Sequence, residues 1–331
     1  MRIRHLLIAA ALSSTLATPA LAHRQWLLPS TTTLAGTSEG VTVDAAVSND
    51  LFYPDHQPID PAQVTVWAPD GAPGTIQNPA KGRYRGTFDV AIDKPGTWKI
   101  GIERSSISGT FKVNGEMWRV GRGRGGPGPG GPGAPGGMPG GPGGMPGGPG
   151  GAPAGAPPAG FGPGGPGGPG GPGGPGGGPR FDPSKVVASV DDIPAGATDI
   201  KLTEMVQQNY VYVSADAPTK GVLTPKGKGL EFDPITHPDA LVSDEEGQFR
   251  FLIDGKPAAG LKVTVVPGAK KFREGEDAQE LATGPDGVVH VKWPVAGFYW
   301  LSVNASDSKP SDKRATDRRM TFTTTVEVVA P

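Results

Sequence analysis

Short apolar runs alternate with turn residues along most of the chain, and this pattern predicts β-strands. No stretch keeps a 3.6-residue apolar period over a dozen positions, so the sequence predicts no long amphipathic helix. Dipeptides such as Asp70-Gly71 and Lys81-Gly82 separate the first runs and are typical of turns between strands. The strands expected in the first part of the chain are residues 40–47, 63–68, 83–90, 97–103 and 110–113.

Two more strands are expected at residues 199–205 and 208–214, where Val211 and Val213 alternate with Tyr210 and Tyr212. Together with the first five they would complete one immunoglobulin-like seven-stranded sandwich. The strands expected in the last hundred residues are 248–253, 260–266, 288–293, 297–303 and 320–329.

This last part predicts a second, smaller sandwich. The Asp254-Gly255-Lys256-Pro257 turn before one strand and the Gly297-Phe298-Tyr299-Trp300 run in another resemble the transthyretin-like or carboxypeptidase-regulatory-like module. Such a fold does not by itself specify a function. The predicted fold class is therefore all-β, with two β-sandwich domains.

A Gly/Pro-rich stretch over residues 121–180 interrupts the pattern and holds much of the chain's 54 glycines and 38 prolines. It has almost no side chains that could bury apolar area against the entropy of ordering, so we expect a disordered insertion. We place it inside the first domain, and a domain boundary at Gly121 is the alternative. The predicted organisation is residues 1–22 as a signal peptide, 23–220 as the first sandwich and 221–331 as the second.

The first 22 residues have the features of a cleavable export signal. Two arginines precede an apolar stretch that is too short to span a bilayer, and Ala20-Leu21-Ala22 forms a small-x-small cleavage pattern. Cleavage there would send the protein to the periplasm and leave His23 as its first residue. A free amino-terminal histidine can chelate one metal ion through its α-amine and its imidazole Nδ1. The alternative is that His23 merely follows the cleavage site.

The remaining composition excludes several classes of function. The net charge is −1 and basic residues are massed only around Arg119 to Arg124, so no nucleic-acid partner is indicated. No later apolar run of about 20 residues provides a transmembrane helix, so no membrane anchor is expected after cleavage. With no cysteine, disulfides, thiolate catalysis and iron–sulfur sites are excluded. A metal site would use histidine, carboxylate, thioether or amino-terminal donors, and imidazole suits nickel, cobalt, copper or zinc.

Four histidines remain after cleavage, and we expect His23, His56 and His237 to be the metal ligands. His56 lies in a loop with Asp50, Tyr53 and Asp55 that could meet the amino terminus, although a solvated loop histidine is the alternative. His237 lies at the start of the second domain between Pro234 and Pro238, which stiffen the backbone, so it could be presented to an interdomain cleft. A structural turn residue is the equal alternative. His290 alternates with two valines, which is typical of a surface residue on a strand.

Several motifs in the mature chain together resemble the DUF4198 family of bacterial periplasmic proteins. They are the Trp26-Leu27-Leu28-Pro29 run after His23, the Phe52-Tyr53-Pro54-Asp55-His56 loop, residues 227–234 and the Asp254-Gly255-Lys256-Pro257 turn. Members of that family are similar to substrate-binding components of nickel and cobalt uptake systems, and some are found with TonB-dependent receptors. The resemblance implies metal or metal-chelate cargo, delivered to an outer-membrane TonB-dependent receptor or an inner-membrane transporter.

No catalytic motif is present: the chain has no Gly-x-Ser-x-Gly elbow, phosphate loop or His-Glu-x-x-His helix. We therefore expect a metal-ion or metal-chelate binding protein, not an enzyme. Two alternatives stay open. One is a structural or adhesive envelope protein that acts through the Gly/Pro-rich segment. The other is a copper-dependent oxidase, because a copper ion on an amino-terminal histidine resembles the arrangement in polysaccharide monooxygenases.

Overall fold

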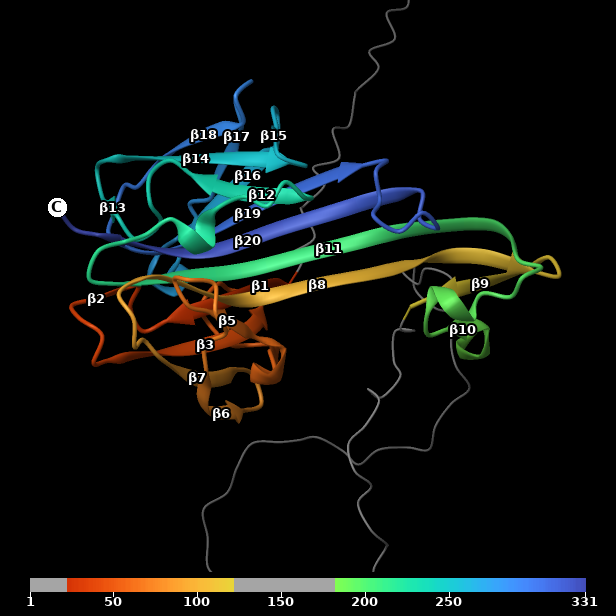
Figure 1. Ribbon diagram of the computed structural model, residues 1–331, viewed down its shortest axis with the longest axis horizontal. Helices are drawn as coiled ribbons and strands as arrows, with labels where there is room; N and C mark the ends of the chain where they lie inside the picture. Colours follow the sequence, from red (N-terminus) through yellow and green to blue (C-terminus); the bar gives the residue numbers. More distant parts are fainter. Residues whose placement is uncertain (1–22, 122–181) are drawn as a thin grey trace, which may run out of the picture.

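The computed structural model describes residues 23–121 and 182–331, and these form β-sheets joined by turns and five short 3-10 helices (Figure 1). The predicted all-β class is confirmed. In the described residues no helix is long and apolar enough to cross a bilayer. The predicted signal peptide and almost all of the Gly/Pro-rich segment lie outside the described residues. The 3-10 helices are η1 (Pro61–Gln63), η2 (Pro183–Lys185), η3 (Val190–Asp192), η4 (Gly221–Leu223) and η5 (Lys270–Phe272).

The first sheet is antiparallel and belongs to the amino-terminal part of the chain. Alternate side chains of its strand β3 are buried, among them Val41, Val43 and Ala45, because one face of the sheet packs on a core. The strand order is β1 (Arg24–Pro29), β3 (Gly40–Ser48), β7 (Gly86–Ala91) and β6 (Ile76–Lys81), with β4 (Gln57–Pro58) also on β3.

The second sheet has eleven strands and runs through the middle of the molecule. Its main path is β10 (Val186–Val187), β9 (Glu116–Val120), β8 (Gly96–Val113), β11 (Thr198–Ala215), β20 (Asp317–Val329), β19 (Gly297–Asp307), β16 (Lys262–Pro267) and β17 (Gln279–Ala282). Three short strands pair with β11, β8 and β20 respectively: β2 (Thr33–Leu34), β5 (Thr65–Trp67) and β13 (Leu241–Val242).

The third sheet packs on the part of the central sheet that is formed by β11, β20, β19 and β16. It comprises β12 (Leu230–Pro234), β14 (Glu246–Ile253), β15 (Lys256–Pro257) and β18 (Val288–Lys292). Its Phe232, Phe249 and Phe251 pack with Phe322 of β20 in one aromatic cluster, with ring centroids 5.0 to 5.8 Å apart for neighbouring pairs. This cluster is the centre of the second sandwich core.

The two sandwiches share the central sheet, because β11 of the first pairs in parallel with β20 of the second. The pairing runs from Thr203 opposite Asp317 to Val211 opposite Thr325. Val211 and Val213 of β11 belong to the core under the first sheet, whereas Tyr210 and Tyr212 belong to the core under the third. The first and third sheets therefore cover opposite faces of one continuous sheet, as Figure 1 shows.

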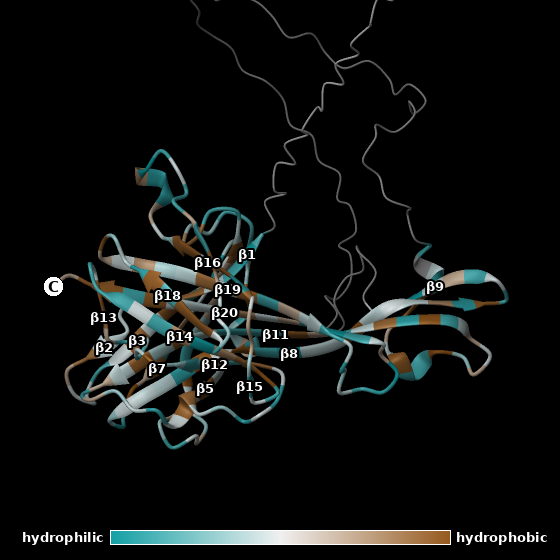
Figure 2. Cartoon of the chain, turned by 90° about the horizontal axis from the view of Figure 1, so that it is seen from above, coloured by the Kyte–Doolittle hydropathy of each residue, from teal (hydrophilic) through white to brown (hydrophobic). Residues whose placement is uncertain are grey.

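An arm extends from this body and consists of the far ends of β8 and β11 together with β9 and β10 (Figure 2). The strands predicted at 97–103 and 110–113 are one strand, β8, and those at 199–205 and 208–214 are one strand, β11. β8 and β11 remain paired from Gly96 opposite Ala215 to Lys112 opposite Thr198, so no turn forms within either strand. The described chain leaves the arm at Gly121 and returns at Asp182, and the Gly121 amide donates to the Val187 carbonyl at 3.0 Å.

Candidate metal centre

His23 and His56 lie in contact, with parallel rings. Their ring centroids are 3.7 Å apart and the ring planes differ by 10°. The pairing of strands explains this meeting: β1 begins at Arg24 opposite Ser48, and β4 begins at Gln57 opposite Val47. β1 and β4 thus flank β3, and each histidine directly precedes the strand on its side. Both side chains are exposed.

The other candidate donors of the His56 loop are engaged by protein groups. Asp50 forms an ion pair with Lys270 at 2.8 Å, and Asp55 accepts hydrogen bonds from the Asn49 amide nitrogen at 2.9 Å and the Asn49 side chain at 3.4 Å. The Lys271 ammonium lies 3.1 Å from the centre of the Tyr53 ring. These contacts fix the loop. The imidazole of His56 is then the available nitrogen donor of the loop, and the imidazole of His23 lies beside it.

The donor set fits a transition metal only if the amino group of His23 takes part. No group of three or more histidine, cysteine, aspartate or glutamate side chains in residues 23–121 and 182–331 can hold a metal ion. Two imidazoles and one α-amine would give three nitrogen donors, a set that suits copper, nickel or zinc. Because the rings lie face to face, at least one imidazole has to rotate before both can bind the same ion. Their exposure permits that rotation.

His237 lies in a different place and does not join the His23–His56 pair. Its Nδ1 accepts a hydrogen bond from the Asp239 amide at 3.1 Å, and its Nε2 lies 3.0 Å from Thr97 Oγ1 and 3.3 Å from the Thr219 carbonyl. Burial lowers the pKa of His237, which keeps the imidazole neutral. Both ring nitrogens are occupied in a junction between the two sandwiches, so this histidine has a structural setting and no free donor.

Asp239 of the same junction is almost fully buried, and burial raises its pKa to about 7. Its carboxyl group accepts a hydrogen bond from Ser214 Oγ at 2.5 Å, which partly opposes this shift. Ser214 Oγ also lies 2.9 Å from Thr97 Oγ1. No sequence pattern singles out Asp239, because a Pro-Asp pair is ordinary in turns.

The remaining ionisable candidates are also paired. His290 contacts Glu246 at 2.6 Å on the exposed side of the third sheet. Glu231 accepts hydrogen bonds from the Gly227 amide at 3.0 Å, and Asp233 forms an ion pair with Arg250 at 2.5 Å. None of these contacts involves His237, and the carboxylate beside its ring is that of Asp239, 3.9 Å from Nδ1.

A groove of about 650 Å³ begins at His23 and continues over the central sheet. Arg24 forms one wall: its guanidinium pairs with Glu276, at 3.0 Å between Nη2 and Oε2, and lies 5.5 Å from the centre of the Trp300 ring. The Trp300 indole donates to the Gln25 carbonyl at 3.1 Å. The hydrogen bond from Arg24 lowers the pKa of Glu276, so this ion pair stays charged at neutral pH.

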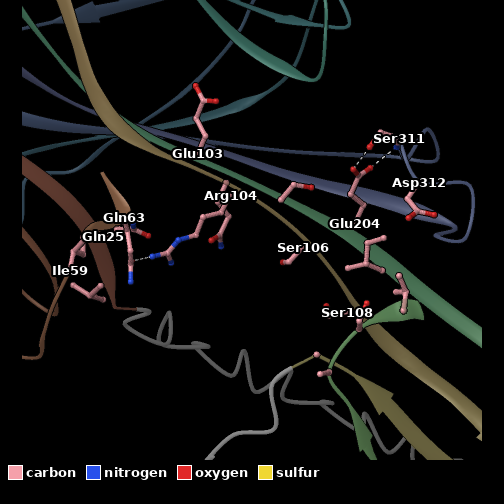
Figure 3. A pocket seen from close by; sticks show the side chains of 18 of the residues that line it. Gln25, Ile59, Gln63, Glu103, Arg104, Ser106, Ser108, Glu204, Ser311 and Asp312 are labelled. Atoms are coloured by element: carbon pink, nitrogen blue, oxygen red, sulfur yellow. Dashed lines mark hydrogen bonds between the residues drawn. The ribbon is translucent and has the colours of Figure 1, made fainter. Parts of the chain in front are cut away.

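A larger hollow of about 1200 Å³ lies beside the groove, between the arm and the first sheet (Figure 3). Arg104 points across it to Gln63, and Glu204 accepts a hydrogen bond from the Ser311 amide at 2.6 Å (Figure 3). The Ser311 hydroxyl also donates to Glu204, and no histidine lies among the residues that line this hollow.

Comparison with known proteins identifies the family. A family model described as a domain of unknown function, DUF4198, matches residues 20–307. A search of curated proteins gave no match. Among solved structures, the D0-D1 domain of intimin matches with 10% sequence identity over 92% of this chain and 97% of that chain, but the TM-score is only 0.17 and supports no transfer of function. The family predicted from the sequence motifs is thereby confirmed, and the chain belongs to the DUF4198 family.

Proposed function

We propose that this protein binds a transition-metal ion, or a metal chelate, in the periplasm, and that it serves an uptake system. In this proposal the ligands are the α-amine and imidazole of His23, exposed by cleavage after Ala22, together with the imidazole of His56. The supporting observation is the 3.7 Å contact between these two rings, which are 33 positions apart in the sequence. Nickel, cobalt and copper are the cargo candidates.

The fold holds in place the backbone segments that carry both proposed ligands, so only side-chain rotation is needed for them to bind one ion. Trp26 and Leu27, which follow directly in β1, are buried at 1% and 0% exposure, and they anchor the strand that carries His23. The Trp26 indole donates to Ser48 Oγ at 2.6 Å, which ties β1 to the start of the loop that carries His56. A binding role without turnover is proposed because the surroundings of the pair contain no acid–base constellation. A TonB-dependent receptor or an inner-membrane transporter is the proposed partner.

The decisive experiment compares two amino termini. Protein beginning at His23 and protein with Ala-Gly-Ala-Gly in front of His23 are titrated with Ni²⁺, Co²⁺, Cu²⁺ and Zn²⁺ in a calorimeter. We expect the four added residues to weaken binding of the tightest-bound metal at least 100-fold, because the amine is then too far from the imidazole to share a chelate ring with it. Equal affinities would refute the proposal.

Two histidine variants of the protein beginning at His23 locate the second ligand. His56→Ala is expected to lower the affinity for the same metal at least tenfold, because it removes one of three nitrogen donors. His290→Ala is the matched control, since it removes an exposed histidine that contacts Glu246 and lies on another sheet. Loss of affinity in the control, or none in His56→Ala, would contradict the assigned site.

A further inference from the structure

The groove that begins at His23 has a polar floor whose groups are arranged in rows across the central sheet. Asn209 of β11 lies opposite Thr323 of β20, Thr323 opposite Ser302 of β19, and Ser302 opposite Thr264 of β16. Paired residues of neighbouring strands share a face and lie about 4.8 Å apart in the hydrogen-bonding direction. The four side chains therefore form a continuous row of amide and hydroxyl groups. In Figure 1 these strands lie side by side.

A second row lies two residues further along the strands. Gln207 is opposite Thr321, and Thr321 is opposite Asn304. The Thr321 hydroxyl donates to the Asn304 side-chain oxygen at 2.9 Å. All of these groove-lining side chains are uncharged and carry hydrogen-bonding groups.

Burial distinguishes the first row from an ordinary solvent-facing side of a sheet. Asn209, Thr323 and Ser302 are only 3%, 6% and 7% exposed. A strand face that simply meets water would carry its polar residues exposed. Here polar side chains are held under the groove, where apolar residues would be more favourable for folding alone.

Asn209 is the strongest evidence for a ligand. Neither its side-chain nitrogen nor its side-chain oxygen has a hydrogen-bond partner among the residues that the structure describes. A buried amide without a partner is unfavourable for folding, so its retention requires a reason other than stability. Both atoms are closed to solvent in the unliganded fold, and they offer one acceptor and two donors to a ligand that displaces the side chains covering them.

Most charges at the rim are paired. Arg24 pairs with Glu276, and Lys262 pairs with Glu280 at 2.8 Å, whereas Arg104 donates to the neutral side chain of Gln63. The rim therefore carries one uncompensated cation, and the two polar rows beneath it are uncharged. The floor also lacks the apolar pockets that would hold the side chains of a peptide.

We propose that this groove binds an uncharged, hydroxyl-rich molecule of the saccharide class. Serine and threonine hydroxyls both donate and accept, as do the hydroxyls of a sugar, so two polar rows match a chain of sugar rings without requiring a charge. A volume of about 650 Å³ is in the range of small-molecule sites. The inference stands on the groove alone and does not depend on metal binding.

The test uses protein beginning at His23, freed of metal with a chelator and then dialysed. Glucose, galactose and mannose and their neutral di- to tetrasaccharides are titrated by calorimetry and by ligand-observed NMR. We expect saturable binding of at least one member of this panel. Asn209→Leu, which keeps the number and branching of the side-chain heavy atoms and removes both unpartnered polar atoms, should weaken that binding at least tenfold. Thr321→Val, in the second row, should weaken it severalfold.

Melting temperature separates a ligand role from a structural one. Asn209→Leu is expected to melt at the same temperature as the unaltered protein or higher, because no hydrogen bond is lost. Gln77→Leu, on the exposed edge strand β6, is the matched control and should leave saccharide binding unchanged. Because the saccharide titrations use metal-free protein, their outcome is independent of the outcome at the metal site.

Three results would overturn the proposal. They are no binding by any member of the panel, binding that Asn209→Leu does not weaken, and a lower melting temperature of Asn209→Leu accompanied by loss of binding. Binding of a neutral tripeptide amide in place of the sugars would assign the groove to a peptide and would equally refute the saccharide class.

Discussion

At the scale of single residues, His23 and His56 differ from His237 in whether their ring nitrogens contact other protein groups. His23 and His56 meet because two strands that flank β3 begin beside one another. His237, which sequence reasoning placed with them, has both ring nitrogens within hydrogen-bond distance of protein groups. Local sequence reveals that a histidine lies in a turn, but it does not reveal which amide or hydroxyl will approach the ring. For that reason, two of the three expected ligands come together and the third does not.

Asp239 provides a prediction at this scale. Its pKa is raised from 3.8 to about 7, so the folded state binds a proton more tightly than the unfolded state. Its contribution to the free energy of unfolding is therefore fully present below about pH 4 and is lost as the pH rises towards 7. Asp239→Asn should remove this pH-dependent contribution to the free energy of unfolding. Above pH 7 the variant should be more stable than the unaltered protein. Urea unfolding at pH 4.5, 5.5, 6.5 and 8 measures the difference.

Asp312 serves as the control for this measurement. Its pKa is lowered to about 2 by hydrogen bonds from Arg314, and it is exposed, so it does not titrate between pH 4 and 7. Asp312→Asn should leave the slope of stability against pH unchanged in that window. His237 is present in both Asp239 proteins, and its opposing contribution cancels to first order in their difference. Parallel pH profiles for Asp239→Asn and the unaltered protein would show that Asp239 is ionised in the fold.

At the scale of elements, the arm is held by a small core of its own. Phe111 of β8, Val120 of β9 and Leu202 of β11 are buried together, and Trp118 stacks on Phe111 with a centroid distance of 6.2 Å. The sequence predicted the strands here but divided β8 and β11 into shorter pieces. Residues 104–109 lie outside the predicted strands and contain three serines and a glycine, yet they stay extended because β11 pairs with them throughout.

Phe111→Ala should loosen the arm without unfolding the body. Removing a buried phenylalanine costs about 3–5 kcal/mol, and here the loss falls on a cluster separate from the two sandwich cores. Hydrogen exchange should become faster in β9 and β10 and remain slow in β3 and β14. Phe322→Ala, in the core of the second sandwich, is the comparison and should speed exchange in β14 and β19. Faster exchange of β3 in Phe111→Ala would show that the arm and the body unfold together.

At the scale of the whole molecule, the sequence predicted the class and most strands but not how the two sandwiches join. Alternation in runs such as 40–47 and 297–303 predicts strands because side chains alternate between a core and the opposite face. The parallel pairing of β11 with β20 joins segments more than a hundred residues apart, and no local pattern encodes it. The polar row through Asn209 was missed for the same reason, since its members come from four separate strands.

Replacing residues 122–181 with a flexible Gly-Ser linker of about ten residues tests the envelope-protein alternative. We expect the shortened protein to melt at nearly the same temperature and to bind metal with unchanged affinity. The reason is that β9 and β10 still pair directly, with Arg119 opposite Val186. Calorimetry and differential scanning measure both quantities. A shortened protein that binds metal normally but no longer supports growth at limiting metal would assign the segment a role of its own.

The shared sheet also restricts how the molecule can move. A pair of domains joined by a linker can open and close as a clamshell, but here nine successive residues of β11 would have to part from β20 before one half could swing against the other. A ligand would therefore reach the groove or the histidine pair through movement of the surrounding loops, and not through opening of one sandwich against the other. Dyes placed on the first and third sheets should report one fixed separation, with cargo or without it.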